Sequence, residues 1–335
     1  MFVICNGSVK SIGHKVTQDN NFDRANCAYG TFIFRDGGYL PGLLMVAYRL
    51  RVMGLKGAKL VCCYTPDISD EVVDVLRQLY DTVFPVEYLR FGRDRKGRQA
   101  PLPSMFTRFR LIQDHPAYEG CLEKILIFDA DMLPLKSYDT LFDLSCPAGV
   151  INESKDHMKS NKEYSGATSQ WEWHEQYSKI CPHGKNIPKI ITDRPLEYPK
   201  ENMGINGGLM LLSPSDKDFA SFKSWCLDES HQDSINEMSW PDMQSITAFY
   251  SGDWTSIDAK YLGLYGYPNI QSLSGVHFIG PKPWQRNLKG FEYRINKYPD
   301  YRLWAEEYIK MCEDMPEILG YKPLENLKQS IQAIL

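Results

Sequence analysis

KILIFDADMLPL (residues 124–135) is the stretch that decides how this sequence is interpreted. Four apolar residues, Ile125 to Phe128, lead directly to two aspartates, Asp129 and Asp131. In an extended chain, residues i and i+2 point to the same side, so the two carboxylates can share one ligand. Carboxylates at close range repel each other unless a cation neutralises them, and such oxygen ligands suit Mg²⁺ or Mn²⁺. The pattern predicts a buried strand that ends in a metal site; the alternative is a solvated turn.

The first half of the chain alternates predicted strands with predicted helices. We expect strands at 28–34, 58–65, 82–89 and 124–128, and helices at 41–54, 67–80 and 104–116. This alternation predicts an α/β fold with a parallel sheet flanked by helices. Ligands of such sheets bind outside the carboxyl ends of the strands, where Asp129 and Asp131 are expected to lie.

The whole chain is divided into three predicted regions. They are an N-terminal arm at 1–27, one α/β domain at 28–290, and a helical extension at 291–335. Within the domain, the polar stretch 153–203 is too long for an ordinary connection and is interpreted as an insertion, either a lid or an acceptor surface. Further elements are expected at 204–215 (strand), 216–230 (helix), 239–254 (helix after Pro241) and 276–284 (strand).

The composition excludes several classes of protein. The chain has 335 residues, of which 43% are hydrophobic, enough for one large α/β domain. A net charge of −4 provides no sequence-wide basic field, which disfavours nucleic acid and anionic lipid as partners. No apolar run approaches the roughly 20 residues of a membrane span, and the N-terminus lacks the regions of a signal peptide. Nine scattered cysteines without a CxxC pair fit reduced thiols, so we expect a cytoplasmic protein.

Four motifs together resemble a known family. They are FDADMLPL from Phe128, INGGLMLLSPS from Ile205, WPDMQSITAFY from Trp240 and HFIGPKPW from His277. In order and approximate spacing they resemble glycogenin-like enzymes of glycosyltransferase family 8, which are retaining enzymes with the GT-A fold. The resemblance runs from about residue 29 to residue 284. It implies a mainly parallel central sheet flanked by helices, and metal-dependent transfer of a hexose, most of all glucose, from a UDP-sugar to an acceptor.

The resemblance also implies the residues that hold the metal and the diphosphate. The ligands of Mn²⁺ (or Mg²⁺) would be Asp129, Asp131 and His277, with Ala130 beside them in the donor site. The bound ion would bridge the two donor phosphates and stabilise the departing UDP. Lys282 and the backbone at Gly280 match groups that reach the diphosphate, although one residue fewer separates them here than in glycogenin. By itself, a lone histidine in an apolar strand is more often a hydrogen-bonded core residue.

Other donor contacts are implied in the same way. The segment FIFRDGGY resembles a uridine-binding turn, and its candidates for base and ribose contacts are Ile33, Arg35, Asp36 and Tyr39. The residues implied at the donor sugar and in catalysis are Arg108, Asn206, Gly207 and Asp242. Three positions depart from the family pattern: Arg108 replaces a lysine, Gly207 a serine, and Met243 a glutamine. Gln244 lies one position further, where a helical side chain faces another direction.

The acceptor is not specified by any motif. Three tyrosines lie where glycogenin-like chains have their acceptor region, namely Tyr261, Tyr265 and Tyr267. Self-glucosylation on one of them is one interpretation, and a buried tyrosine network is the other. A glycan, another protein or a small molecule also remains open as the acceptor. By family analogy, the chain could form a homodimer.

Three other functions compete with this interpretation. The Asp129-x-Asp131 pattern also resembles haloacid-dehalogenase-type phosphatases, but Leu133 stands where a threonine is frequent and no later Asp-Asp pair follows a strand. The segment RDGGYLPG lacks the glycine-rich loop of sugar-nucleotide pyrophosphorylases. The third is a catalytically silent GT-A-like scaffold that binds sugar nucleotide or glycan, or acts structurally. Met243 and Gly207 favour this scaffold, whereas the complete set of metal and phosphate residues disfavours it.

Overall fold

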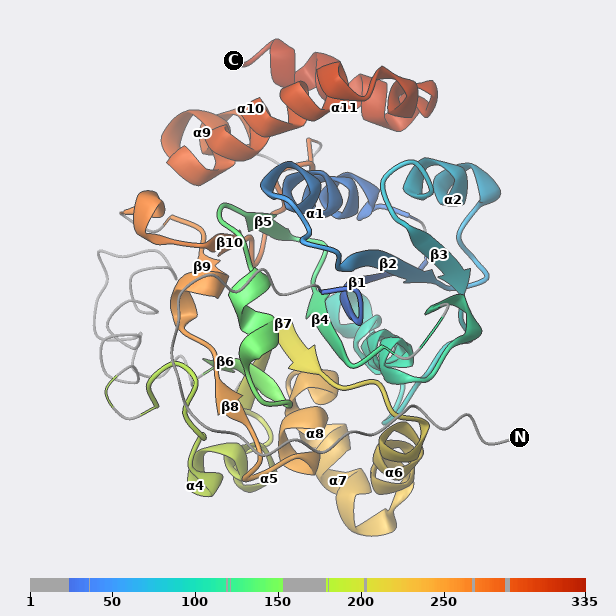
Figure 1. Cartoon of the computed structure of the whole chain (residues 1–335), viewed down its shortest axis with the longest axis vertical. Coiled ribbons are helices and arrows are strands. Elements are labelled where there is room, and N and C mark those ends of the chain that lie inside the picture. Colours follow the sequence, from blue (N-terminus) through green and yellow to red (C-terminus); the bar gives the residue numbers. More distant parts are fainter. Residues whose placement is uncertain are drawn as a thin grey trace.

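The centre of the molecule is a seven-stranded sheet in the order β3-β2-β1-β4-β7-β6-β8, with a three-stranded sheet, β5-β10-β9, beside it (Figure 1). The computed structural model describes residues 24–35, 37–118, 120, 122–152, 179, 181–201, 204–266, 269–286 and 290–335. The strands of the large sheet are β1 (Cys27–Ile33), β2 (Lys59–Tyr64), β3 (Thr82–Pro85), β4 (Lys124–Phe128), β6 (Ala148–Asn152), β7 (Gly204–Leu212) and β8 (Thr255–Ser256). Those of the small sheet are β5 (Met132–Pro134), β9 (Gly263–Leu264) and β10 (Gly275–His277).

The direction of the strands decides what lies at the end of β4. Strands β1 to β4 are parallel, as predicted from the alternation of strands and helices. Strand β7 is antiparallel to both β4 and β6. The first residues of β7 therefore lie beside the last residues of β4, and the amide of Asp129 donates to the carbonyl of Gly208 at 3.1 Å. A mainly parallel sheet flanked by helices is thus confirmed as the fold class.

Helices cover both faces of the large sheet, because its central strands are apolar on both sides. In β4, Leu126 and Phe128 belong to one hydrophobic core, whereas Ile125 and Ile127 belong to the other. The first core includes residues of α1 (Leu40–Met53), α2 (Asp70–Leu76), α9 (Phe291–Lys297), α10 (Pro299–Asp314) and α11 (Lys322–Gln332). The second includes residues of η2 (Leu102–Ile112), α6 (Asp216–Leu227), α7 (Glu229–Glu237) and α8 (Pro241–Phe249). Two short helices, α4 (Lys189–Thr192) and α5 (Arg194–Glu197), precede β7.

Two predicted elements differ in kind or length from those observed. The helix expected at 104–116 is a 3₁₀ helix, η2, over Leu102–Ile112, although runs of this type rarely exceed about four residues. The strand expected at 276–284 ends at His277. Gly280 follows with φ of 85°, and the prolines on either side of Lys282 lack the N–H that a strand ladder requires.

The N-terminal boundary of the domain lies earlier than predicted. Cys27 is the first residue of β1, and Arg24 is buried in ion pairs with Asp139 (3.3 Å) and Asp143 (2.9 Å). The last residues of the predicted arm therefore belong to the folded domain. Residues 1–23, and 153–178 of the predicted insertion, lie outside the described residues. The seven cysteines that the structure describes are all free thiols.

The predicted C-terminal extension shares the core of the domain. Trp304 and Tyr308 of α10 are completely buried, and Trp304 stacks on Tyr308 with ring centroids 5.1 Å apart. The Trp304 ring also lies 5.7 Å from that of Trp284. Arg49 of α1 forms an ion pair with Glu307 of α10 at 2.6 Å. Figure 1 shows α9, α10 and α11 together at the top of the molecule, next to α1.

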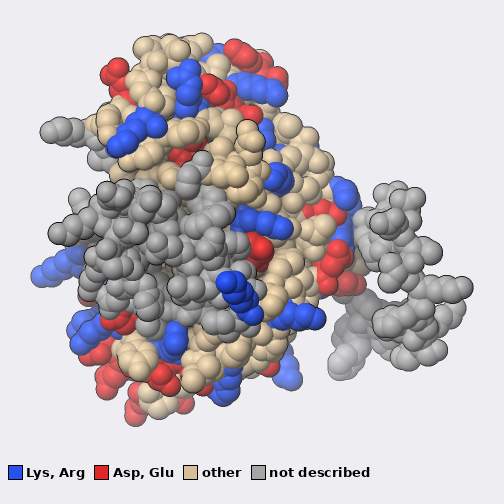
Figure 2. Space-filling view, turned by 90° about the vertical axis from the view of Figure 1, so that its left-hand side faces the viewer, with Lys and Arg blue, Asp and Glu red and all other residues tan. Residues whose placement is uncertain are grey.

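The surface and the helices give two further findings. On the face drawn in Figure 2, basic and acidic side chains are interspersed over the described residues. No helix that the structure describes combines the length and the apolar character needed to cross a membrane.

We predict that Trp304→Ala lowers the free energy of unfolding by about 3–5 kcal/mol, because it leaves a cavity between α10 and the loop of Trp284. Urea denaturation measures the loss. The matched control is Tyr293→Ala in α9, whose side chain is 58% exposed and whose loss should change stability by no more than about 0.5 kcal/mol. Equal, small losses of stability in both variants would contradict a hydrophobic core shared by α10 and the rest of the domain.

Candidate functional site

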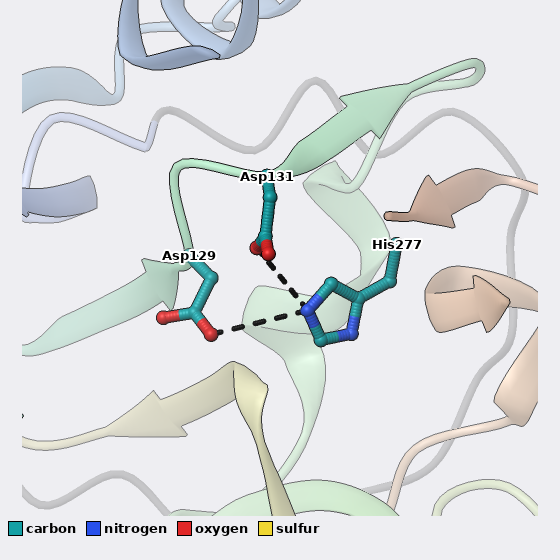
Figure 3. A group of neighbouring side chains, drawn as sticks. All are labelled: Asp129, Asp131 and His277. Carbon is teal, nitrogen blue, oxygen red and sulfur yellow. Dashed lines mark ion pairs between the residues drawn. The ribbon is translucent and has the colours of Figure 1, made fainter. Parts of the chain in front are cut away.

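The two aspartates of the opening motif lie on a turn rather than on an extended strand. The chain turns at Ala130 and Asp131, and the amide of Met132 donates to the carbonyl of Asp129 at 3.3 Å. The expectation of an extended pair was therefore wrong, but the turn still directs both carboxylates toward one point (Figure 3). Strand β5 begins directly after the turn and pairs with β10, which places Met132 opposite His277.

Asp129, Asp131 and His277 form a candidate metal site. Their ligand atoms all lie within 4.8 Å of one another. Nε2 of His277 is 3.2 Å from Oδ1 of Asp131 and 4.0 Å from Oδ2 of Asp129. Among the residues that the structure describes, Oδ1 of Asp131 is buried without a hydrogen-bond partner, so an acceptor oxygen is unsatisfied where the three side chains meet. Two carboxylates and one imidazole are a ligand set that suits Mn²⁺ and can hold Mg²⁺.

A glycine makes room for the histidine. A Cβ atom at Gly208 would lie 2.7 Å from Cε1 of His277, closer than such atoms approach. The amide of Gly208 donates to Oδ1 of Asn206 at 2.9 Å. Asn206, a predicted donor-sugar residue, thus holds the start of β7 in place, and its side-chain nitrogen donates to Asn152 at 3.3 Å.

Arg108 connects two of the predicted acidic residues. Its side chain is buried and comes from η2. Its Nη1 atom lies 2.9 Å from Oδ1 of Asp129 and donates to the carbonyl of Gly207 at 2.5 Å. Its Nε atom lies 3.2 Å from Oδ2 of Asp242, and its guanidinium packs 5.0 Å from the ring centroid of Phe32. The structure therefore brings Arg108, Asp129, Gly207 and Asp242 together.

Lys282 is bound to the other aspartate of the pair. Its ammonium group donates to Oδ2 of Asp131, and to the carbonyl of Phe278 at 2.8 Å. Burial raises the pKa of Asp131, but Lys282 and His277 outweigh it and hold that pKa well below its usual range. Burial likewise disfavours the ammonium, yet Asp131 raises the pKa of Lys282. Without nucleotide, Lys282 thus neutralises a carboxylate that the metal would need.

The site carries a surplus of negative charge. Three buried or half-buried carboxylates, those of Asp129, Asp131 and Asp242, face two fixed cations among the described residues, Arg108 and Lys282. Burial raises the pKa of Asp129 to about 6, against the effect of Arg108 and with the help of Asp131. A carboxylate whose charge is disfavoured in this way is stabilised by an added cation. The charge balance therefore supports the metal site independently of the geometry.

Asp242 occupies the first turn of α8, directly after Pro241. It is 2% exposed, and burial raises its pKa despite Arg108 and the helix amides. Gln244 does not replace the glutamine missing at Met243. Its fully buried amide accepts from the Trp240 amide (2.7 Å) and donates to the carbonyls of residues 199 (3.0 Å) and 201 (2.9 Å). All of these bonds are structural, so Gln244 is committed to holding the segment before β7.

The remaining donor candidates surround the end of β1. Ile33 is buried, whereas Arg35 is exposed and has a left-handed backbone with φ of 70°. Tyr39 is 44% exposed, and its ring lies 6.0 Å from the ammonium of Lys282. Gly280 is exposed next to the Lys282 loop. Asp36 lies outside the described residues, so the structure does not place it.

Two residues at this turn escaped the sequence analysis. Asp67 accepts hydrogen bonds from Thr65, from Tyr88 (2.7 Å) and from the backbone of Arg35. Burial raises its pKa, but these hydrogen bonds prevail and lower it. Gly42 lets α1 approach the site, because a Cβ there would collide with the carbonyl of Ala130. Asp67 lies in no motif, Gly42 ends the segment RDGGYLPG, and the role of each is recognised only by its contacts across the fold.

The candidate acceptor tyrosines are partly described. Tyr261 is buried, packs 5.5 Å from Tyr138 and accepts at its carbonyl from the Tyr138 hydroxyl at 2.7 Å. Tyr265 is half-buried beside Tyr301, at a ring distance of 5.5 Å. Tyr267 lies outside the described residues. Tyr261 and Tyr265 have the contacts of a buried network; self-glucosylation stays a prediction.

Comparison with known proteins supports the fold. No protein-family model matches the chain. The uncharacterized protein R707 of Acanthamoeba polyphaga mimivirus is 25% identical over 312 residues, which cover 86% of this chain and 95% of R707. Glycogenin of Neurospora crassa is 36% identical over 120 residues, but these cover 35% of this chain and only 16% of that glycogenin.

Two solved structures resemble the chain over most of its length. The apo form of the glycosyltransferase GlyE of Streptococcus pneumoniae TIGR4 gives a TM-score of 0.50 with 12% identity, covering 90% of this chain and 64% of GlyE. An active-site mutant of LgtC covers 84% of this chain and 95% of its own length, with a TM-score of 0.49 and 16% identity. Together with the mainly parallel sheet, the likeness to GlyE shows that the chain has the GT-A fold.

We predict that Gly207→Ser is destabilising while Arg108 is present. A Cβ at Gly207 would lie 2.8 Å from Nη1 of Arg108, which three contacts hold in place. The expected loss is about 1–3 kcal/mol of unfolding free energy. In an Arg108→Lys background the same change should cost at least about 1 kcal/mol less, because the shorter ammonium leaves space. Urea denaturation of the four proteins measures this coupling.

The control for this cycle is Gly320→Ser, since a Cβ at Gly320 has no neighbour within 4 Å. Its effect should be small and the same in both backgrounds. If Gly207→Ser changes the unfolding free energy equally with arginine and with lysine at position 108, the two positions are not coupled through space.

We also predict that Lys282→Met strengthens the binding of Mn²⁺ without nucleotide by about tenfold, or about 1.4 kcal/mol. The ammonium competes with the metal for Asp131, and its removal frees Oδ2 of that carboxylate. The same variant should bind UDP with Mn²⁺ more weakly, because a cation near the phosphates is lost. Isothermal titration measures both. Lys136→Met is the control, since Lys136 is exposed and donates to the carbonyl of Gln271. Unchanged or weaker binding of Mn²⁺ alone would show that Lys282 does not compete.

Proposed function

We propose that this chain is a metal-dependent retaining glycosyltransferase that moves a hexose from a UDP-sugar to an acceptor, with glucose as the favoured hexose. The observation that carries the proposal is the convergence of Asp129, Asp131 and His277 within 4.8 Å, at the carboxyl end of β4 in a GT-A fold. Ligands of open α/β sheets bind at such ends. The glycogenin match over 120 residues supports a UDP-sugar as donor.

The residues of the site have separate roles in this proposal. Asp129, Asp131 and His277 would hold Mn²⁺ or Mg²⁺, which when bound supplies positive charge to the donor diphosphate. Lys282 would exchange its bond with Asp131 for one to a phosphate oxygen, which keeps the ammonium paired. Tyr39 and the backbone at Arg35 would border the nucleotide, beside the turn that Asp67 stabilises.

Arg108 and Asp242 would act at the sugar end of the donor. Arg108 fixes the orientation of both carboxylates that it contacts, Asp129 and Asp242. Asp242 is held at the start of α8 and would accept hydrogen bonds from sugar hydroxyls. Both side chains are almost fully buried, so the arrangement is rigid before the donor binds. Retention of the anomeric configuration follows from the family resemblance rather than from these contacts.

The test is a thermal-shift screen of UDP-sugars and GDP-sugars with and without Mn²⁺. A ligand at 100 times its Kd stabilises the native state by about 2.7 kcal/mol. We expect a rise in Tm that requires both Mn²⁺ and a UDP-sugar, together with Mn²⁺-dependent hydrolysis of that sugar nucleotide. GDP-sugars should produce a smaller shift.

Asp131→Asn and His277→Ala should each abolish the Mn²⁺-dependent part of the shift and of hydrolysis. The control is Asp143→Asn, which lies on the surface near Arg24 and should leave both unchanged. If the unaltered protein shows no shift with any sugar nucleotide, the chain is better described as a catalytically silent scaffold. If the Asp131 variant keeps full activity, the metal site is wrongly assigned.

A further inference from the structure

A polar surface pocket of about 330 Å³ lies between the loop after β3 and the end of α7. One wall is the basic loop that follows β3, with Arg93, Arg95 and Lys96; the other is the end of α7 and the residues after it, including Glu237 and Ser239. The two walls are joined: the Arg93 amide donates to the Asn236 side chain at 2.6 Å. We call this region the Arg95 pocket.

The Arg95 pocket has more positive than negative charge. Its two acids are already bonded to cations, Asp94 to Arg90 at 2.6 Å and Glu237 to Lys200 at 3.7 Å. Within the part of the chain that the structure describes, Arg93 and Lys96 form no ion pair. Among the lining residues three cations stand against two acids, and both acids are paired with cations outside the lining, in a chain whose net charge is −4. A local excess of this sign favours an anionic ligand.

One of these cations is held in a fixed position. A terminal nitrogen of Arg95 donates to the carbonyls of Asn236 (3.2 Å) and Met238 (2.6 Å). Both acceptors are neutral, so the bonds orient the guanidinium without cancelling its charge. A guanidinium fixed in this way binds phosphate or carboxylate with a smaller loss of side-chain entropy.

The pocket is close to the predicted point of sugar transfer. The loop of Arg93 leaves the carboxyl end of β3, and β3, β2, β1 and β4 are parallel, so this is the sheet edge at which Asp129 lies. Ser239 lines the pocket and Asp242 follows three residues later, so their Cα atoms are at most about 11 Å apart.

Two aromatic residues flank the segments that meet at Ser239 of the pocket: Trp240 follows Ser239, and Tyr198 precedes residues 199 and 200, whose carbonyls accept from Ser239 at 3.0 and 2.6 Å. Trp240 is 44% exposed and Tyr198 is 52% exposed, so both rings can be reached from solvent. Gln244 bonds the backbone of Trp240 and that of residues 199 and 201, so one buried amide fixes both segments. Exposed aromatic rings provide apolar faces on which sugar rings can pack, with polar edges left in water.

We propose that the Arg95 pocket binds an anionic group, a phosphate or a carboxylate, carried by a glycan acceptor whose sugar rings pack on Trp240 and Tyr198. The inference rests on the proposed function, because it assigns the acceptor class of that same site. The acceptor would be a charged carbohydrate, and its anion would fix the distance between the accepting hydroxyl and Asp242.

The binding of trisaccharides in the absence of a sugar nucleotide tests whether the Arg95 pocket binds an anionic group. Maltotriose, maltotriose 6-phosphate and maltotriose carrying a uronic acid are titrated into the unaltered full chain at low salt. We expect the charged forms to bind at least tenfold more tightly than maltotriose. The double variant R93E/K96E should remove this difference, whereas Trp240→Ala should weaken all three sugars. The matched control K217E/K223E reverses two exposed charges on α6 and should leave the preference intact. The stronger of the two charged sugars identifies phosphate or carboxylate as the preferred anion.

Equal binding of charged and neutral trisaccharides, no binding of any of them, or an unchanged preference in R93E/K96E would each overturn the proposal. The same proteins are examined by the Mn²⁺-dependent UDP-sugar shift and by donor hydrolysis, which R93E/K96E should leave unchanged. If the unaltered chain shows neither the shift nor hydrolysis, the proposed function is contradicted, while the preference for charged sugars still stands. Failure of the proposed function and failure of the pocket proposal are therefore distinguishable.

Discussion

The buried guanidinium of Arg108 is the contact on which the candidate site depends. It joins η2 to the ends of three other elements: Asp129 after β4, Gly207 in β7 and Asp242 in α8. An unpaired charge at this depth would cost several kcal/mol, so the arginine is stable only when its partners are in place. The carboxylates need the arginine for the same reason. This mutual dependence sets the positions of the acidic groups before any ligand arrives.

Lys282 depends on a second set of contacts, from the C-terminal helices. The hydroxyl of Tyr301 in α10 donates to the carbonyl of Pro281 at 2.6 Å, and Arg286 donates to the carbonyl of Asn326 in α11. Trp284 donates to the carbonyl of Gly38 at 2.9 Å, which ties the same loop to the turn after β1. The helices of the predicted extension therefore hold the loop that carries Lys282. They support the candidate site as well as the hydrophobic core.

Local patterns in the sequence predicted the sheet and the ends of its strands, because burial on both faces leaves continuous apolar runs such as 125–128. The pairing of Asp129 with Asp131 was predicted correctly but for a wrong reason, since a turn and not an extended strand brings the carboxylates together. His277 approaches the two aspartates because β5 pairs with β10, and the paired residues are about 145 positions apart in the chain. Only the family resemblance indicated that His277 lies near the aspartates. The roles of Asp67 and Gln244 arise from long-range hydrogen bonds, which no local pattern encodes.

The departures from the family pattern have different physical meanings. Gly207 and Arg108 fit each other: a serine at 207 would place its Cβ 2.8 Å from the guanidinium. We expect the shorter side chain of a lysine at 108 to leave that space. The pair is therefore a matched exchange, and Gly207 is weak evidence for a site that has lost its function. Met243 has no such partner, because Gln244 is fully used in holding the segment before β7. The argument for a silent scaffold thus depends on Met243 alone, against a charge surplus at Asp129, Asp131 and Asp242 that a bound cation would relieve.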